Sequence, residues 1–187
     1  GAGTDTADYS ASAAGVTVSL ASGTGTGGDA QGDTLTQVEN LTGSAQGDSL
    51  TGDGNANQMD GGAGDDLLDG QAGTDTLLGG AGNDTLTGGA GADVLNGGAD
   101  TDTASYALSA SGVTVSLASG TGSGGDAQGD TLTQIENLAG SAQGDSLTGD
   151  GNANQLDGGA GGDQLDGGAG IDTLLGGNGN DTLTGGA

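Results

Sequence analysis

The fold is decided by residues 61–105, which divide into blocks of nine that read GGAGDDLLD, GQAGTDTLL, GGAGNDTLT, GGAGADVLN and GGADTDTAS. Each block opens with glycine and carries aspartate at its sixth position and an apolar residue at its eighth. The pattern is G-G-x-G-x-D-x-U-x, in which U is apolar, and it is typical of parallel β-helices.

The same pattern begins at Gly43, with GSAQGDSLT and GDGNANQMD, and returns from Gly140 to the end of the chain. We expect the first six residues of each block to form a tight turn and the last three a short strand, with the eighth residue pointing inward. Two blocks complete one coil of about 18 residues, which predicts an all-β fold, a parallel β-roll or β-solenoid.

The chain also repeats over a longer distance. Residues 1–90 align without gaps to residues 98–187, and 76 of these 90 positions are identical. We predict two tandem 97-residue units, interpreted as a window of a longer array. The ranges are 1–97 for the first unit, with irregular coils at 9–41 and a nonapeptide roll at 43–105, and 98–187 for the second, with irregular coils at 106–138 and a roll at 140–187.

The stretches without the nine-residue period are expected to continue the solenoid as irregular coils. Each contains GVTVSL, in which alternating residues such as Val16 and Val18 predict a half-buried strand. A glycine-rich turn, GTGTGGDAQGD, is expected to follow. Leu35, Val38 and Leu41 are spaced as in a short helix, but their glycine-rich and β-branched surroundings favour further coils.

Composition indicates that packing alone does not order this chain. It has 26 acidic residues, no Lys, Arg or His, a net charge of −26 and 47 glycines. Such a balance is typical of disordered chains, whereas a bound cation would cancel the repulsion and add its binding free energy to folding. Nucleic acid and anionic membranes are disfavoured partners because no basic residue is present, and no apolar run is long enough for membrane insertion.

The acidic turns offer the donor atoms that one class of metal prefers. Backbone carbonyls and Asp oxygens of two stacked turns give the six or more hard oxygen ligands that suit Ca²⁺. Zn²⁺ and Cu²⁺ favour nitrogen or sulfur, and Mg²⁺ holds its water too tightly for a carbonyl-rich cage. We therefore predict several calcium ions as cofactors. The expected pairs of turns are Asp66 with Asp84, Asp84 with Asp102, Asp75 with Asp93, and Asp163 with Asp181.

The nonapeptides resemble the repeats of RTX (repeats-in-toxin) proteins, and VENLTGSAQGDSLTG at 38–52 resembles the entry into the RTX rolls of secreted proteases and large adhesins. The nonapeptides span about 111 of the 187 residues. The resemblance implies that glycine carbonyls join the aspartates as calcium ligands. The implied metal-site residues are Asp48, Gly62, Gly64, Asp66, Gly73, Asp75, Gly80, Gly82, Asp84, Gly89, Gly91, Asp93, Asp102, Asp145, Gly159, Gly161, Asp163, Gly168, Gly170, Asp172, Gly177, Gly179 and Asp181.

Some positions depart from the motif. Asn57 and Asn154 replace the sixth-position aspartate with an uncharged amide, so those turns are expected to be weak or empty sites. Gln71 replaces a position-two glycine, which weakens the expected site there. Tyr9 and Tyr106 are interpreted as packing residues that close a run of nonapeptides.

Four acidic residues outside the motif recur at equivalent places in the two units. Glu39 and Glu136 are interpreted as polar residues at coil corners in preference to ligands. Asp33 and Asp130, in GDTL, are compatible both with a ligand role and with an ordinary turn.

RTX resemblance implies export in the unfolded state through a type I secretion channel and folding outside the cell, where calcium is near the ~10⁻⁴–10⁻³ M affinity of extracellular modules. We expect a calcium-binding spacer or fibre of an extracellular or cell-surface bacterial adhesin, S-layer or matrix protein, which self-associates or packs against neighbouring repeats of the same chain.

The alternative is the C-terminal secretion module of an enzyme (a protease, lipase or epimerase) or toxin. Catalysis within this chain is not expected, because it has no His, Cys, Lys or Arg. Ice binding is disfavoured because the fifth positions form no rank of threonines.

Overall fold

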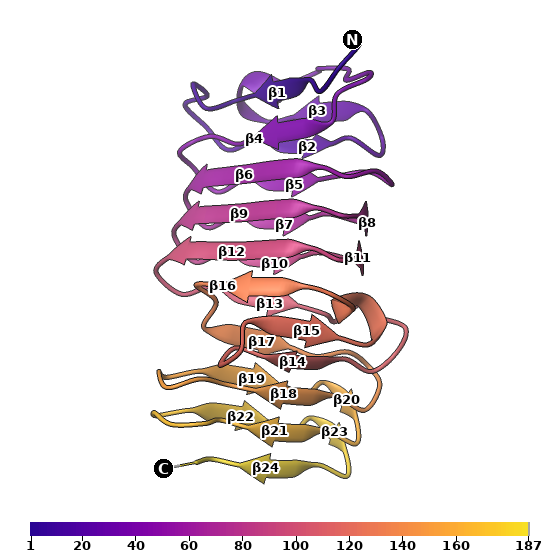
Figure 1. Cartoon of the computed structure of the whole chain (residues 1–187). Coiled ribbons are helices and arrows are strands. Elements are labelled where there is room, and N and C mark those ends of the chain that lie inside the picture. The colour runs from indigo at the N-terminus through magenta and orange to yellow at the C-terminus, as the bar shows by residue number, and fades with distance from the viewer. Residues whose placement is uncertain (187) are drawn as a thin grey trace.

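The computed structural model describes residues 1–186, which wind into an elongated solenoid of stacked coils (Figure 1). Two long sheets face each other along its length, and strands of the rolls alternate between them. Almost all strand pairs are parallel, and the only helices within 1–186 are two 3₁₀ turns. The predicted all-β solenoid is therefore confirmed.

The larger sheet has 11 strands. In spatial order they are β1 (Thr6–Asp8), β4 (Asn40–Thr42), β6 (Gln58–Ala63), β9 (Thr76–Ala81), β12 (Val94–Ala99), β16 (Thr131–Thr133), β15 (Thr121–Ser123), β14 (Thr114–Ser116), β18 (Ser146–Thr148), β21 (Gln164–Asp166) and β24 (Thr182–Thr184).

The opposite sheet has nine strands, and two small ladders lie in the turns. The nine are β22 (Thr173–Leu175), β19 (Gln155–Asp157), β17 (Asn137–Ala139), β13 (Thr103–Ser105), β10 (Thr85–Thr87), β7 (Leu67–Asp69), β5 (Ser49–Thr51), β2 (Thr17–Ser19) and β3 (Thr24–Thr26). The small ladders pair β8 (Ala72–Gly73) with β11 (Ala90–Gly91), and β20 (Ala160–Gly161) with β23 (Asn178–Gly179).

Stacking in the rolls has the expected register of two nonapeptides. Leu68 of β7 lies opposite Leu86 of β10, and Met59 of β6 lies opposite Leu77 of β9. Turns 18 residues apart in the sequence are consequently neighbours along the solenoid.

The core between the two sheets is one column of eighth-position side chains from each sheet. In the first roll these residues are completely buried; they are Leu50, Met59, Leu68, Leu77, Leu86, Leu95 and Ala104. Each coil of about 18 residues thus contributes only two inward-pointing apolar side chains to the core. A core this thin leaves the edges of the solenoid, where the turns lie, to supply further stabilisation.

Residues 9–41 and 106–138 join the sheets and carry a hairpin. Strands β2 and β14 pair in parallel with the roll strands β5 and β18, and Val16 and Val18 are buried as predicted. The glycine-rich segment is more ordered than expected. Instead of a simple turn it forms an antiparallel strand, β3 or β15, and a 3₁₀ helix, η1 (Gly28–Ala30) or η2 (Gly125–Ala127). The buried methyl groups of Ala30 and Ala127 hold these helices against the core.

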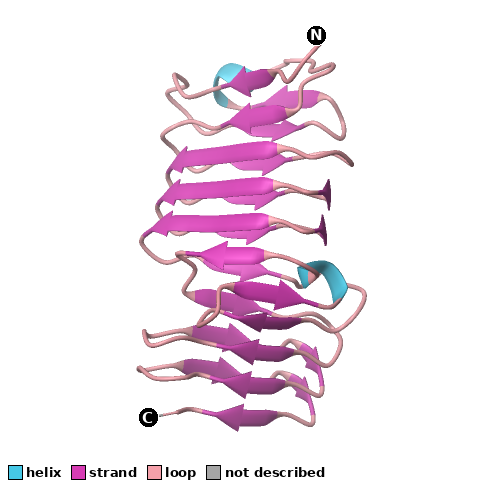
Figure 2. Ribbon diagram, in the orientation of Figure 1, coloured by secondary structure: helices cyan, strands magenta, loops and turns pink. Residues whose placement is uncertain are grey.

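Equivalent strands of the two sequence repeats lie in opposite sheets. Strand β5 belongs to the nine-stranded sheet, whereas its counterpart 97 residues later, β18, belongs to the 11-stranded sheet. The helices η1 and η2 accordingly lie on opposite sides of the solenoid (Figure 2). The chain passes from one sheet to the other once in every half-coil. A 97-residue step contains an odd number of such passages, so equivalent strands end in opposite sheets.

Candidate metal centre

The turns of the rolls bring backbone carbonyls into close stacks. Gly80, at position two, has φ +116°, and a Cβ there would collide with the carbonyl oxygen of Gly62 in the preceding turn. Gly82, at position four, has φ +124° and would collide with the carbonyl of Gly64. Glycine allows this backbone conformation and this close approach without a steric clash, so the motif glycines create a carbonyl-lined edge.

One carboxylate oxygen of each sixth-position aspartate joins neighbouring turns. Oδ1 of Asp84 accepts the backbone N–H of Asp66 at 2.8 Å, and Oδ1 of Asp102 accepts that of Asp84 at 2.8 Å. The other edge repeats this arrangement, with Oδ1 of Asp93 2.8 Å from the amide nitrogen of Asp75. We call these rows the aspartate ladders. They bring together the pairs of turns that the sequence predicts, Asp163 with Asp181 at 3.1 Å included.

The second carboxylate oxygen of the ladder aspartates is buried and, within residues 1–186, has no hydrogen-bond partner. This holds for Oδ2 of Asp66, Asp75, Asp84, Asp93, Asp102, Asp163 and Asp172. The oxygen lies against the first glycine of its own turn, so closely at Asp84 that a Cβ on Gly79 would collide with it. Among these residues, Asp66, Asp75, Asp84, Asp93 and Asp102 are at most 3% exposed, so bulk solvent does not reach their unpartnered oxygens.

Buried anionic oxygens without donors require a compensating positive charge. Two unit charges about 5 Å apart repel by on the order of 3 kcal/mol at an effective dielectric constant near 20, and burial adds a desolvation cost. The chain supplies no Lys, Arg or His. Carboxylate and carbonyl oxygens are the donor set that calcium prefers, so Oδ2 of the ladder aspartates and the carbonyls of the stacked glycine turns fit this ion. No group of three or more His, Cys, Asp or Glu side chains within 1–186 is arranged to hold a metal, so carbonyls must complete any site.

At Asp66, Asp75 and Asp102, burial and like charge together raise the pKa of the carboxyl group. Desolvation is the largest cause at Asp66, where neighbouring carboxylates such as Asp84 add to it and the pKa is raised to about 7. Desolvation likewise raises the pKa of Asp75 and of Asp102 to about 6. Without a cation, the folded chain therefore holds protons that an unfolded chain releases.

The predicted aspartates fall into distinct environments. The seven with an unpartnered Oδ2 fit a metal site directly. In contrast, both oxygens of Asp48 already accept hydrogen bonds, from the backbone of Val16 and from Ser44, and Asp145 has the equivalent partners. Metal ligation by these two residues stays a prediction.

The motif departures also differ from one another. Gln71 adopts φ +73°, so its turn keeps the conformation of a glycine turn, and Asp75 in that turn has an unpartnered Oδ2. The side chain of Asn57 is fully engaged, since its Oδ1 accepts the Asp53 N–H at 2.8 Å and its Nδ2 donates to the Glu39 carbonyl at 2.8 Å. That the asparagine turns are weak or empty metal sites stays a prediction, and this arrangement is consistent with it.

Sequence reasoning missed the role of the tyrosine hydroxyls. Tyr9 and Tyr106 are buried, as expected, but their hydroxyls also donate to Oδ2 of Asp33 and Asp130, at 3.0 Å in each case. The same Tyr–Asp spacing in both repeats was the available signal. Glu136 takes a ladder position, because its Oε2 accepts the Asp102 N–H at 2.9 Å.

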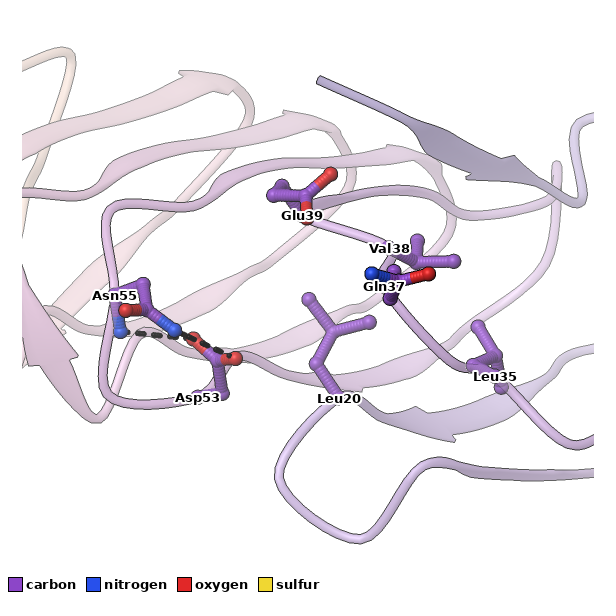
Figure 3. Close-up of a pocket in the computed structure, with 7 residues that line it drawn as sticks. All are labelled: Leu20, Leu35, Gln37, Val38, Glu39, Asp53 and Asn55. Atoms are coloured by element: carbon purple, nitrogen blue, oxygen red, sulfur yellow. Dashed lines mark hydrogen bonds between the residues drawn. The ribbon is translucent and has the colours of Figure 1, made fainter. Parts of the chain in front are cut away.

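One cleft in the first repeat is not part of the aspartate ladders. It has a volume of about 430 Å³ and is lined by Leu20, Leu35, Gln37, Val38, Glu39, Asp53 and Asn55 (Figure 3). In the second repeat the residues equivalent to Leu35 and Val38 are Leu132 and Ile135. Both are buried, and Leu132 pairs with Leu95 of β12. The cleft therefore exposes a surface that serves as core elsewhere in the solenoid.

A family model described as the RTX calcium-binding nonapeptide repeat matches residues 37–68, 69–104, 130–165 and 157–187, more than half of the chain. The chain belongs to this RTX family. The RTX repeats identify it as a calcium-binding structural module, in agreement with the donor set of the ladders. A search of curated proteins found no match. Within residues 1–186 no helix has the length and apolar character that crossing a membrane requires.

Replacing a ladder carboxylate with an amide tests the metal site. In Asp84→Asn the amide oxygen still accepts the Asp66 N–H, but an NH₂ group replaces the unpartnered oxygen. We expect fewer bound calcium ions by isothermal titration calorimetry, and at least about tenfold weaker affinity at the remaining sites of that edge. The control Asp60→Asn removes the same charge from a partly exposed carboxylate outside the ladders, and should bind as the parent does. Equal losses in the two variants would contradict the assignment.

The raised pKa values predict an inverted pH dependence in calcium-free buffer. A carboxyl whose folded-state pKa lies above its unfolded value of 3.8 favours folding below that value, and this contribution is lost as pH rises through about 6–7. The far-UV circular dichroism signal of β structure should therefore be stronger at about pH 5 than at about pH 7.5. With calcium present the order should reverse, because protons compete with the ion. A calcium-free chain that is more structured at the higher pH would contradict this reasoning.

Proposed function

We propose that the chain is a structural spacer or fibre segment of a secreted bacterial RTX protein, and that it folds when it meets calcium outside the cell. The observation that carries the proposal is the row of buried, unpartnered carboxylate oxygens on both edges of the solenoid. A chain with a net charge of −26 has no internal cation for these oxygens. Calcium binding and folding are therefore one equilibrium.

Folding on calcium suits a protein that crosses membranes unfolded. Cytosolic calcium is far below the ~10⁻⁴–10⁻³ M affinity of extracellular modules, so the ladders would stay unfilled inside the cell. Export through a type I channel followed by folding on emergence is consistent with this switch. It would place the segment at the bacterial cell surface or in the extracellular matrix.

The tandem repeat favours a spacer over the secretion module of an enzyme. Two units that are identical at 76 of 90 aligned positions add length without adding a new site. The solenoid stacks each coil mainly on its neighbours, so further units extend it in one direction. An adhesin, an S-layer protein or a matrix protein requires a long segment of this kind. Neighbouring repeats of the same chain would be the nearest partners of the segment.

A calcium titration followed by far-UV circular dichroism tests the folding switch, with magnesium as the control ion. We expect a cooperative change from coil to β structure near millimolar calcium and no change with the same concentration of magnesium. A β signal that persists in excess chelator at neutral pH, or that magnesium produces equally well, would show that calcium does not drive folding.

A further inference from the structure

The buried acidic side chains do not all depend on a cation. In residues 61–102, which we call the roll block, Asp66, Asp75, Asp84, Asp93 and Asp102 each keep an unpartnered Oδ2. In residues 106–154, which we call the joint block, the ladder positions hold Asp130, Glu136, Asp145 and Asn154. Glu136 is partly exposed, and protein donors satisfy the buried side chains of the other three.

At Asp130 a protein donor satisfies the oxygen that has no partner in the roll block, although burial still raises the pKa of this carboxyl to about 6. Asp130 is 1% exposed and stands in the ladder, since its Oδ1 accepts the Asp93 N–H at 2.9 Å. Its Oδ2 accepts the hydroxyl proton of Tyr106 at 3.0 Å. Tyr106 is itself 2% exposed, so this hydrogen bond is shielded from water.

A change of backbone conformation satisfies Asp145. In the roll block, position two has positive φ, as at Gly80 and even at Gln71. In the turn that ends at Asp145 this position is Ser141, which is not among the residues with positive φ. The Ser141 N–H instead donates to Asp145 Oδ2 at 2.6 Å, and its hydroxyl donates to Oδ1 at 3.0 Å. The backbone thus presents a donor at the place where the glycine turns leave a carboxylate oxygen unpartnered.

The last ladder position of the joint block follows the same rule. Oδ1 of Asn154 accepts the Asp150 N–H at 2.8 Å, and its Nδ2 donates to the Glu136 carbonyl at 2.8 Å. Across the boundary with the roll block, Nε2 of Gln134 donates to the Gly98 carbonyl at 2.8 Å. Amide groups thus satisfy acceptors that in the rolls would face a cation.

We propose that the joint block is the part of the chain that folds at the lowest calcium concentration, and that the roll block folds from it as calcium rises further. The proposal rests on the calcium-driven folding proposed above and adds an order to it. At intermediate calcium the joint block keeps its hydrogen-bonded coils while the roll block is unfolded. Its outer strands then offer a template on which the next coil stacks. Residues 9–57 carry the equivalent donors Tyr9, Ser44 and Asp53 and form a second joint block in the first repeat.

Hydrogen exchange measured by mass spectrometry on the whole chain, at stepped calcium concentrations, tests this order. We expect amides of 106–154 to gain protection at lower calcium than amides of 61–102. Equal midpoints in the two blocks, or the reverse order, would overturn the proposal while leaving calcium-driven folding intact. Protection that is independent of calcium in both blocks would instead overturn the proposed function, and the folding order with it.

The variant Tyr106→Phe tests the donor directly. It leaves Asp130 Oδ2 buried without a partner, so the calcium midpoint for protection of 106–154 should rise at least about fivefold, towards that of the roll block. The joint block of the first repeat, 9–57, provides an internal reference that should not move. Ser119→Ala removes an exposed hydroxyl from the same block and should have no effect. An unchanged midpoint in Tyr106→Phe would overturn the role of the hydroxyl.

Discussion

The structure depends on how the second oxygen of each buried aspartate is satisfied. The first oxygen binds the next coil through a backbone N–H, which fixes the stacking of the turns. In seven of the roll aspartates the second has no protein donor, and the chain contains no basic side chain that could provide one. Hydrogen bonding therefore places the carboxylates in rows, and these rows are stable only when a cation or a proton neutralises them.

The thin core makes this dependence unavoidable. Each coil buries only two eighth-position side chains, such as Leu77 and Leu86, while it orders many glycines. Glycine loses more conformational freedom on folding than any other residue. The burial of one column of apolar side chains per sheet offsets only a small part of this entropy cost. The same glycines are nevertheless required, because only they let the carbonyls of successive turns approach each other at the edge. The glycines therefore destabilise the folded chain when calcium is absent and also form the metal site.

The nine-residue spacing predicted the fold, the inward eighth positions and the pairing of turns 18 residues apart, because these features repeat and depend on local chemistry. The spacing did not predict which buried carboxylate oxygens have protein donors. That difference depends on long-range donors, such as Tyr106 to Asp130 across 24 residues, and on the backbone conformation of Ser141. The spacing also did not predict the conformation of Gln71, which replaces a motif glycine and yet keeps a positive φ. The reversal of sheets between repeats likewise follows from the path of the inserted hairpins, which no single motif encodes.

Crystallography of the calcium-loaded chain tests the central claim most directly, because anomalous scattering locates each ion. Our account predicts ions about 2.3–2.6 Å from Oδ2 of ladder aspartates such as Asp66, Asp84 and Asp93, completed by glycine carbonyls, and none at Asp130. Calcium bound only to the exposed carboxylates outside the ladders, with the ladder oxygens still unpartnered, would contradict it.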